Sequence, residues 1–280
     1  MKNIILSAFA DEYDADFETQ LKGLNKFDIK YIEIRFVNGK NISTLGDDEI
    51  AQVKTLLDKY QIKVNAIGSP LGKIRLDQDT EEHLRLTERV CRIANMLDCK
   101  YIRMFSFYAP KGEDIVCYRS KVLDLLGKMA DIALERGVVL CHENEANIFG
   151  ESPKACLDVL QSLNGKLKAV FDMGNFALGG YDALEAYALL KNHIQYFHIK
   201  DGFKDGRIVP PGKGEAEIAK ILADYTEKCD NPVFITLEPH LQTFDGLNAL
   251  TDNKLEHEYV YETQMAAFED AVNKIKEIIR

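Results

Sequence analysis

Short apolar runs alternate along the whole chain with longer amphipathic segments, and this alternation constrains the fold more than any other feature. Successive runs begin roughly 25 to 40 residues apart, which is typical of strands that alternate with helices in βαβ units. The predicted strands are Asn3–Phe9, Tyr31–Arg35, Lys63–Gly68, Tyr101–Phe105, Val138–Glu143, Lys168–Asp172, Tyr196–Lys200 and Val233–Glu238. The predicted helices are Asp16–Phe27, Asp47–Tyr60, Glu81–Leu97, Tyr118–Arg136, Pro153–Leu163, Ala183–Leu190, Glu215–Lys228 and Glu258–Ile279.

Eight such units predict an α/β fold, a single (β/α)8 TIM barrel over residues 1–280 with a parallel eight-stranded barrel inside a layer of helices. An open doubly wound sheet is the competing architecture, and it usually has a Gly-rich phosphate turn after its first strand. The first run ends in Ser7-Ala8-Phe9-Ala10, which lacks that turn. No Pro- or Ser-rich linker divides the sequence, so one domain is expected.

Composition narrows the class of partner. The chain has 35 Lys and Arg against 45 Asp and Glu, a net charge of −10, and an anionic surface repels nucleic-acid backbones. The apolar stretches are too short for a membrane span or a signal peptide. The six cysteines lack CxxC spacing and predict free thiols. We therefore expect a cytoplasmic protein with a small-molecule partner, no nucleic acid and no membrane, and with homo-oligomerisation left open.

Each of the last four predicted strands ends in a polar side chain, although a strand buried on both faces should be apolar. The carboxyl ends of barrel strands form the mouth where active sites lie, so these side chains should converge. Three carboxylates and one imidazole in a small volume need a cation. Oxygen-rich ligands with one nitrogen favour a single Mn²⁺, with Mg²⁺, Co²⁺ or Zn²⁺ as alternatives. The four candidate ligands are Glu143, Asp172, His198 and Glu238.

Alternatives to this set lie close in the sequence. A single acid at a strand end is also explained by a helix N-cap or a salt bridge, whereas four on successive strands are harder to explain in this way. Glu145 shares a strand face with Glu143 and is the alternative ligand, although Glu143 directly ends the apolar run. His142 precedes Glu143, faces the helix layer and is expected to be structural.

Eight short stretches carry a family resemblance in barrel order: SAFADE (7–12), YIEIR (31–35), IGSPLGKI (67–74), HENE (142–145), FDMGNF (171–176), HIKD (198–201), PGKGE (211–215) and LEPHL (237–241). They resemble the sugar phosphate isomerase/epimerase group of xylose isomerase-like TIM barrels, which includes ketose 3-epimerases, hydroxypyruvate isomerase and inosose-processing enzymes. The resemblance implies that Glu143, Asp172, His198 and Glu238 bind one divalent cation. It also implies that Glu143 and Glu238 are the catalytic acid/base pair. The substrate is not identified, because the fold hosts many reactions.

The chain departs from the ketose 3-epimerases at two places. Those enzymes carry a His three residues after the strand-six Asp, where this sequence has Asn175. They carry an Arg six residues after the strand-seven His, where this sequence has Lys204, with Arg207 close by. These differences count against a free-ketose 3-epimerase in particular and leave the metal chemistry intact.

Further residues are candidates for substrate binding, each with a structural alternative. Arg103 on predicted strand four needs an anionic partner, either a substrate group or one of the metal-site acids. Glu33 and Arg35 are expected to pair with each other or with Arg103. Lys200 shares the face of His198 and either meets a substrate oxygen or phosphate or pairs with a local acid.

Three loop features complete the candidates. His240 follows the strand-eight Glu, but Pro239 turns the chain between them, so its contact with substrate is one interpretation only. The Gly-rich turn at residues 212–214 opens a helix and either binds phosphate or is only a tight turn. The loop at 69–73 is a candidate lid or anion-binding loop.

The sequence thus predicts a metal-dependent isomerase or epimerase of a small sugar or sugar derivative. Proton abstraction next to a carbonyl by the Glu143/Glu238 pair would give an enediolate intermediate. A dehydratase or lyase of a keto-polyol such as an inosose is the alternative on the same scaffold. An AP endonuclease is much less supported, because that branch needs a His-rich multi-zinc site and this chain has six His. A non-catalytic sugar-binding barrel is the remaining alternative.

Overall fold

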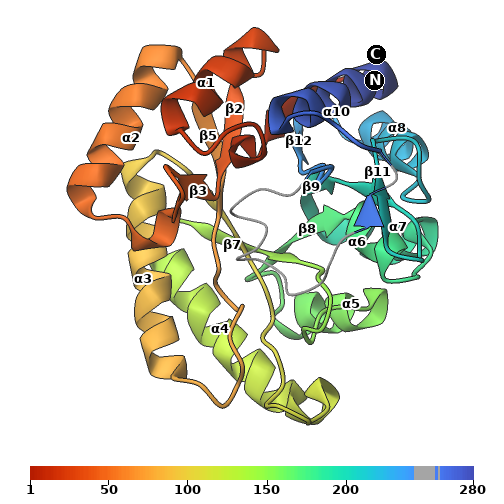
Figure 1. Ribbon diagram of the computed structural model, residues 1–280. Coiled ribbons are helices and arrows are strands. Elements are labelled where there is room, and N and C mark those ends of the chain that lie inside the picture. The colour runs from red at the N-terminus through yellow and green to blue at the C-terminus, as the bar shows by residue number, and fades with distance from the viewer. Residues whose placement is uncertain (243–255, 258) are drawn as a thin grey trace.

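The computed structural model describes residues 1–242, 256–257 and 259–280. Eight parallel strands form one sheet that curls into a nearly closed barrel surrounded by helices (Figure 1), which confirms the predicted fold. The strand order β1-β12-β9-β8-β7-β6-β5-β2 places β1 and β2 at the two ends of the sheet, where they contact each other. The barrel strands are β1 (Ile4–Ala8), β2 (Tyr31–Ile34), β5 (Lys63–Gly68), β6 (Tyr101–Met104), β7 (Val139–Glu143), β8 (Lys168–Asp172), β9 (Ile194–Ile199) and β12 (Val233–Leu237).

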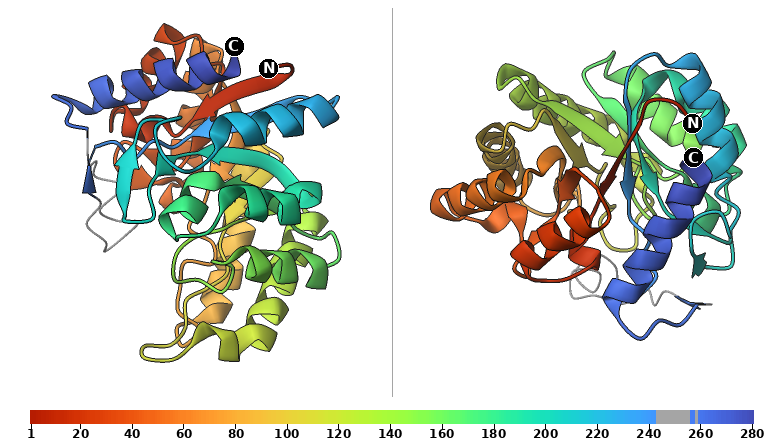
Figure 2. Two further views of the ribbon diagram at one scale, coloured as in Figure 1. Left: turned by 90° about the vertical axis from the view of Figure 1, so that its right-hand side faces the viewer. Right: turned by 90° about the horizontal axis from the view of Figure 1, so that it is seen from above.

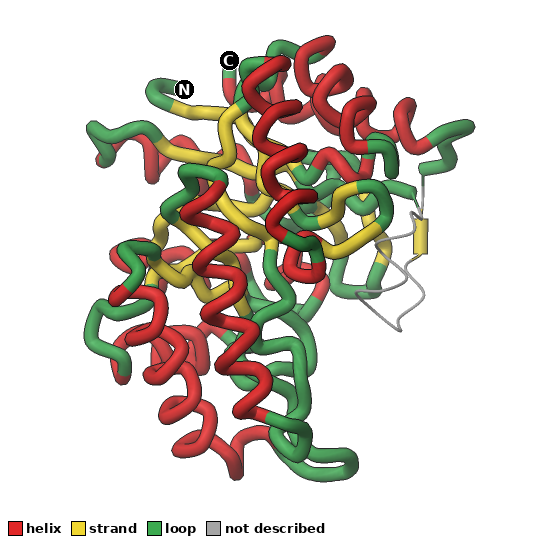
Figure 3. The backbone as a smooth tube through the Cα atoms, turned by 90° about the vertical axis from the view of Figure 1, so that its left-hand side faces the viewer, coloured by secondary structure: helices red, strands yellow, loops and turns green. Residues whose placement is uncertain are grey.

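Helices form the outer layer, shown in red around the yellow strands in Figure 3. They are α1 (Phe17–Lys26), α2 (Asp47–Tyr60), α3 (Thr80–Met96), α4 (Arg119–Glu135), α5 (Pro153–Ser162), α6 (Met173–Leu178), α7 (Ala183–Leu190), α8 (Ile218–Lys228) and α10 (Gln264–Ile279). Several begin at a side chain that accepts a backbone N–H of the first turn, which satisfies a donor left open by the helix. These N-caps include Asp16, Asp79, Ser152, Asp182 and Thr263.

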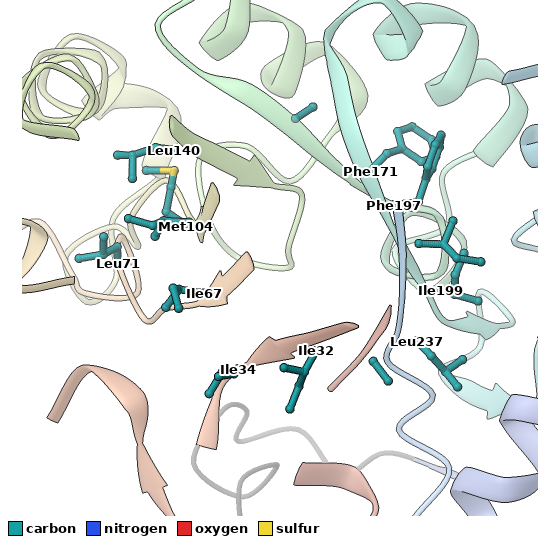
Figure 4. Close-up of a cluster of buried hydrophobic side chains, with 14 of the residues drawn as sticks. Ile32, Ile34, Ile67, Leu71, Met104, Leu140, Phe171, Phe197, Ile199 and Leu237 are labelled. Atoms are coloured by element: carbon teal, nitrogen blue, oxygen red, sulfur yellow. The ribbon is translucent and has the colours of Figure 1, made fainter. Parts of the chain in front are cut away.

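Successive side chains along each barrel strand point alternately toward the helices and toward the barrel interior. Side chains at one set of alternate positions pack outward against the helices, and Figure 4 shows part of this core with Met104, Leu140, Phe171, Phe197 and Leu237. The other set faces the barrel interior, where Ala66, Cys141, Val170 and Tyr196 form a smaller apolar cluster. Because side chains alternate with a period of two, the next inward positions along β7, β8 and β9 are Glu143, Asp172 and His198.

Most predicted helix boundaries lie within one residue of the observed ones, and three larger differences remain. The α6 helix was not expected, and it begins directly after Asp172, whose carboxylate caps it. The α8 helix begins at Ile218 rather than Glu215, because Asp201 binds the turn at residues 212–216. The last helix begins at Gln264, since Thr263 caps it and residues 259–263 are not helical; residue 258 lies outside the described residues.

Within the described ranges, five short strands lie outside the eight-stranded sheet. The strand β3 (Phe36–Val37) pairs with β4 (Lys40–Asn41), and β10 (Asp201–Gly202) pairs with β11 (Arg207–Val209), which also pairs with β13 (Glu256–His257).

The two chain ends lie side by side in every view of Figures 1 and 2. The Met1 ammonium donates to the carbonyl of Ile279 at 2.7 Å, which ties the start of the first strand to the last helix. Among the described residues, no helix is both long and apolar enough to cross a membrane.

The loop after β5 is held by a buried imidazole, and this contact predicts acid sensitivity. Nε2 of His83 accepts the N–H of Gly72 at 2.7 Å, and burial lowers the pKa of His83 to about 4. In the unfolded chain this pKa is about 6.5, so between pH 6.5 and 4 the imidazole is protonated in the unfolded state and neutral in the native state. Stability should be complete above pH 6.5 and fall by on the order of 3 kcal/mol as the pH drops to 4.

Urea unfolding of the wild type and of His83→Gln at several pH values measures this effect. The Gln variant keeps an acceptor for Gly72 and has no imidazole to titrate, so its stability should fall less between pH 6.5 and 4. Parallel pH profiles of the two proteins would show that His83 does not contribute.

Candidate metal centre and active site

The four predicted ligands meet at the mouth of the barrel. Glu143, Asp172 and His198 lie on β7, β8 and β9, and Glu238 directly follows β12. One potential ligand atom from each residue lies within 4.8 Å of the others, and all four residues are buried. They converge because β9 is paired with β8 on one side and with β12 on the other, in a register that sets Asp172 beside His198.

Each carboxylate of this cluster has one oxygen anchored by the protein and one oxygen directed to the other members. The anchored atoms are Asp172 Oδ1, which accepts the N–H of Asn175 at 2.8 Å, Glu143 Oε2, which lies 3.2 Å from Arg103 Nε, and Glu238 Oε1, which accepts from Arg35 Nη1 at 2.7 Å. The remaining oxygens of Glu143 and Glu238 lie 2.9 and 3.2 Å from Nδ1 of His198.

His198 is oriented by an acid that the sequence did not identify as its partner. Its Nε2 lies 3.0 Å from Oε2 of Glu33, whose other oxygen accepts the hydroxyl of Tyr196 at 3.0 Å. A carboxylate on the far nitrogen of a ligating His is the usual way in which proteins fix the tautomer and aim the near nitrogen. Burial disfavours the imidazolium, but Glu143 and Glu33 outweigh it and raise the pKa of His198 well above its usual value.

These donors fit a divalent cation. Three carboxylate oxygens and one imidazole nitrogen form a hard, oxygen-rich set suited to Mn²⁺ or Mg²⁺. Oε2 of Glu238 is buried and accepts no hydrogen bond of good geometry within the part of the chain that the structure describes. This oxygen has ion-pair contacts only, at 3.2 Å with His198 and 3.5 Å with Lys200, and a cation at this position would satisfy it.

Lys200 lies within the same cluster, on the strand face of His198. Its ammonium donates to Oδ2 of Asp172 at 3.1 Å and to Oδ1 of Asn175 at 3.0 Å, and it lies 3.5 Å from Oε2 of Glu238. Lys200 therefore pairs with local acids, the structural alternative given above. Asn175, at the position where the epimerases carry a His, supports this lysine.

Asn144 is a residue that the sequence analysis did not identify. Its side-chain amide exchanges two hydrogen bonds with the backbone N–H and C=O of Asp172, at 3.0 and 2.9 Å. Its own carbonyl accepts the side chain of Asn175 at 2.9 Å. This fixes the end of β8 against the end of β7, and no local signal distinguishes such an Asn from a loop residue.

Arg35 forms a second buried network against Glu238. Its guanidinium binds Asp11 through Nε and Nη2 at 2.9 and 3.3 Å, and it lies 3.4 Å from Glu12. Glu33, the expected partner of Arg35, lies 4.0 Å from Arg103 and does not pair with Arg35; its nearer partner is His198, at 3.0 Å. His240 joins this network with Nε2 3.2 Å from Glu238 and 3.4 Å from Glu12.

Two acids of these networks, Asp172 and Glu238, have pKa values shifted in opposite directions. Burial raises the pKa of Asp172 to about 7 despite Lys200 beside it. Burial also opposes ionisation of Glu238, but Lys200 and His240 outweigh it and hold the pKa of Glu238 well below its usual range. The lower pKa of Glu238 means that this glutamate is a carboxylate, the form that binds a cation.

Arg103 pairs with Glu143 at 3.2 Å, so its partner is one of the metal-site acids proposed above. It also donates to the carbonyl of Ser69 at 3.2 Å and lies against the ring of Phe105. Lys73, on the loop after β5, pairs with Glu145 at 3.1 Å. Its ammonium also lies over the ring of Phe105, 4.3 Å from the ring centroid. Glu145 thus has a partner away from the four-residue cluster, and Glu143 is the one of the two glutamates that lies in that cluster.

The β10–β11 hairpin carries the other two predicted substrate contacts. The side chain of Lys204 is exposed, and Arg207 pairs with Asp205 at 3.0 Å and stacks on Phe203. These contacts do not connect them to the four-residue cluster, and their role in substrate binding stays a prediction.

The backbone N–H groups of the Gly-rich turn bind a side chain of the protein. The carboxylate of Asp201 accepts the N–H groups of Gly212, Gly214 and Ala216 at 2.8 to 3.0 Å. A Cβ at Gly214 would overlap Oδ1 of Asp201 and the backbone of Gly202, so glycine is needed for this approach. The turn is a tight turn bound to an internal anion, the structural alternative to a phosphate site.

Comparison with known proteins gives the same fold over the whole chain. The profile of the xylose isomerase-like TIM barrel family matches residues 21–252. A D-allulose 3-epimerase from Methylomonas sp. is similar with 16% identity and a TM-score of 0.76, covering 99% of both chains. A probable 3-DHS dehydratase from Bacillus anthracis is similar with 16% identity and a TM-score of 0.73, again covering 99% of both. A xylose isomerase-like protein from Mycobacterium smegmatis, solved with magnesium, has 12% identity and a TM-score of 0.68, covering 99% of this chain and 98% of that one. The search of curated proteins gave no match.

Proposed function

Since the chain belongs to the xylose isomerase-like TIM barrel family, we propose that it is a divalent-metal-dependent isomerase or epimerase of a small sugar or sugar derivative. One observation carries this proposal: three carboxylates and one imidazole direct one donor each at a common point, within 4.8 Å of one another. Glu143, Asp172, His198 and Glu238 would hold the ion, with Mn²⁺ favoured. The bound ion would stabilise the negative charge that develops on the substrate carbonyl oxygen.

The two glutamates supply the proton transfer. Glu143 ends β7 and Glu238 follows β12, and the order of the sheet places β8 and β9 between these two strands. The two carboxylates therefore approach a substrate at the mouth from different sides. One removes a proton from the carbon next to the carbonyl, and the other returns a proton to the opposite face or to the neighbouring carbon.

The anchors of these glutamates keep them in position during that transfer. Arg103 holds Oε2 of Glu143 and Arg35 holds Oε1 of Glu238, so each carboxylate keeps its other oxygen directed into the four-residue cluster, where cation and substrate would meet. Charge-assisted contacts of this kind fix the geometry that efficient proton transfer requires.

Dehydration is the second candidate, and Lys200 is the observation that favours it. Its ammonium lies 3.5 Å from Oε2 of Glu238 and donates hydrogen bonds within the site. A departing hydroxyl group next to Glu238 would be stabilised by the same donor. NMR of the products separates the two reactions, because dehydration removes a hydroxyl group and epimerisation does not.

Metal binding by these four residues is tested by Asp172→Ala. Elemental analysis of wild-type protein purified without chelator should find about one metal ion per chain, and the variant should contain almost none. Glu145→Gln is the matched control, since Glu145 pairs with Lys73 and should leave the metal content unchanged. Full occupancy in a folded Asp172→Ala protein, or loss in Glu145→Gln, would contradict the ligand assignment.

A further inference from the structure

We infer that Arg35 keeps this site at one metal ion per chain, because it takes the place of a second ion between Glu12, Glu238 and His240. The inference goes beyond the proposed function and rests on one part of it, the binding of a first ion by the four-residue cluster. It is carried by the contacts around Oε1 of Glu238, the oxygen that Arg35 binds.

A second set of potential metal donors lies beside the four-residue cluster and shares Glu238 with it. One atom each of Glu12, Glu238 and His240 lies within 4.8 Å of the others, and all three residues are buried. Nε2 of His240 lies 3.2 Å from Oε1 of Glu238 and 3.4 Å from Oε1 of Glu12. Donors bound to a metal at about 2.1 Å lie about 3.0 to 3.4 Å apart, so this spacing is that of neighbouring ligands. Two carboxylates and one imidazole suit Mn²⁺, Fe²⁺ or Zn²⁺.

His240 is brought to these acids by an unusual backbone conformation. Its φ is 49°, in the left-handed region that is uncommon for residues other than glycine. Its N–H donates to Oε2 of Glu12 at 2.8 Å, so Glu12 contacts both the backbone and the imidazole of this residue. Backbone strain of this kind is concentrated at functional sites, and here it directs the imidazole to the oxygens of Glu12 and Glu238.

Arg35 already binds the same two oxygens. Its Nη1 lies 2.7 Å from Oε1 of Glu238, and its Nη2 lies 3.4 Å from Oε1 of Glu12. A divalent cation bound at these oxygens would lie next to the guanidinium, and like charges that close repel each other strongly in a buried site. The second donor set therefore binds a side chain of the protein where it would otherwise bind a metal ion.

The position of Arg35 is fixed, so it does not leave these oxygens to a cation. Its side chain is fully buried, and its Nε and Nη2 bind the two oxygens of Asp11 at 2.9 and 3.3 Å. Its guanidinium carbon lies 4.2 Å from the centre of the ring of Phe9. A guanidinium bound through two nitrogens and placed on an aromatic ring has little freedom to move. Its displacement would also break the buried contact with Asp11, which is costly.

The number of ions determines which chemistry the site supports. Two ions that share a carboxylate hold both the attacking and the leaving oxygen of a displacement, as in phosphatases and nucleases. One ion beside two glutamates suits proton transfer next to a carbonyl. Arg35 thus favours the one-ion reaction over two-metal hydrolysis.

The test is the number of Mn²⁺ ions per chain at saturating Mn²⁺, measured by equilibrium dialysis and elemental analysis. The wild type should hold about one ion and Arg35→Met about two, since Met is uncharged and leaves the space of the two terminal nitrogens. Saturation is needed because the loss of Arg35 also loosens Glu238 and weakens the first ion. Binding is measured at about pH 8.5, because metal ligands must be deprotonated and burial raises the pKa of Glu12 to about 8.

Three further variants locate the additional ion. Arg119→Met makes the same change at an exposed ion pair with Asp158 and should keep about one ion. Arg35→Lys retains a positive charge and should also keep about one ion. Arg35→Met combined with His240→Gly removes the imidazole at a backbone position that glycine accepts, and it should return the count to about one.

The EPR spectrum of the bound Mn²⁺ gives a second readout. Two ions that share Glu238 are magnetically coupled, so the spectrum of Arg35→Met should differ from that of the single ion in the wild type. Arg35→Gln replaces Arg35→Met in these measurements if the Met variant does not fold, since its amide is uncharged and keeps a donor for Asp11.

A folded Arg35→Met or Arg35→Gln protein that binds only one ion would overturn the inference. Two ions in the wild type, or a second ion that persists in the double variant, would overturn it as well. Failure of the proposed function has a different signature, because the wild type would then bind no ion or would bind one without exchanging deuterium next to a substrate carbonyl. The inference concerns only the additional ion that the Arg35 variants bind.

Discussion

Glu143→Gln and Glu238→Gln are each expected to lower turnover by about 10²-fold or more, the usual scale for loss of a general acid or base. Gln is nearly isosteric with Glu and keeps a carbonyl oxygen for the cation, but it cannot accept the proton. Both variants should therefore remain folded and keep at least part of their metal. The measurement combines elemental analysis with deuterium exchange and product formation, on a substrate found by screening.

The control for this experiment is Glu145→Gln, which makes the same chemical change two residues from Glu143 but at a carboxylate that pairs with Lys73. Its loss of turnover should be much smaller than that of either ligand variant. If Glu143→Gln or Glu238→Gln stays folded, binds metal and still exchanges deuterium at nearly the wild-type rate, that glutamate is a ligand only. The proton would then be carried by another group, with Lys200 and His240 as candidates.

Replacement of Arg35 by Met is expected to have the largest effect on stability. The guanidinium is fully buried, holds Glu238 at 2.7 Å and Asp11 at 2.9 Å, and lies 4.2 Å from the centre of the ring of Phe9. Met fills much of the same volume but leaves these acids buried without their cation. Breaking a buried ion pair in this way costs about 3 to 5 kcal/mol.

Urea unfolding at neutral pH, with and without Mn²⁺, measures this loss. Arg35→Lys is the conservative variant: it restores the charge but not the planar fork that binds Asp11 through two nitrogens, so it should recover only part of the stability. Metal affinity should follow the same order, because Arg35 fixes the oxygen of Glu238 that faces away from the cluster. An Arg35→Met protein within about 1 kcal/mol of wild type would contradict this role, given the usual cost of a broken buried pair.

The barrel and the four polar strand ends were predictable from local pattern. A strand of a parallel barrel is buried on both faces, so its residues are apolar and any polar strand end stands out. The period of two then gives the inward face: Lys200 was expected beside His198, and His142 away from Glu143, and the structure has both. His142 instead lies 3.0 Å from Ser106 on the outer side.

Helix boundaries were predictable where the cap is local. Asp16 and Ser152 lie next to the helices that they cap, so residue type and position suffice. The start of α8 was predicted three residues too early, because the turn before it is bound by Asp201, more than ten residues upstream.

Pairing among the charged residues was decided by the tertiary structure. The sequence indicates that Glu33, Arg35 and Arg103 need partners, but strand tilt and register determine which acid lies across the barrel from each. In the folded chain Glu33 binds His198, Arg35 binds Glu238, and Arg103 binds Glu143. Residue type and the alternation of side chains along each strand thus determined which side chains enter the mouth. Only the closed barrel decided which of them meet, because the partners of Glu33 and Arg35 lie 165 and 203 residues away along the chain.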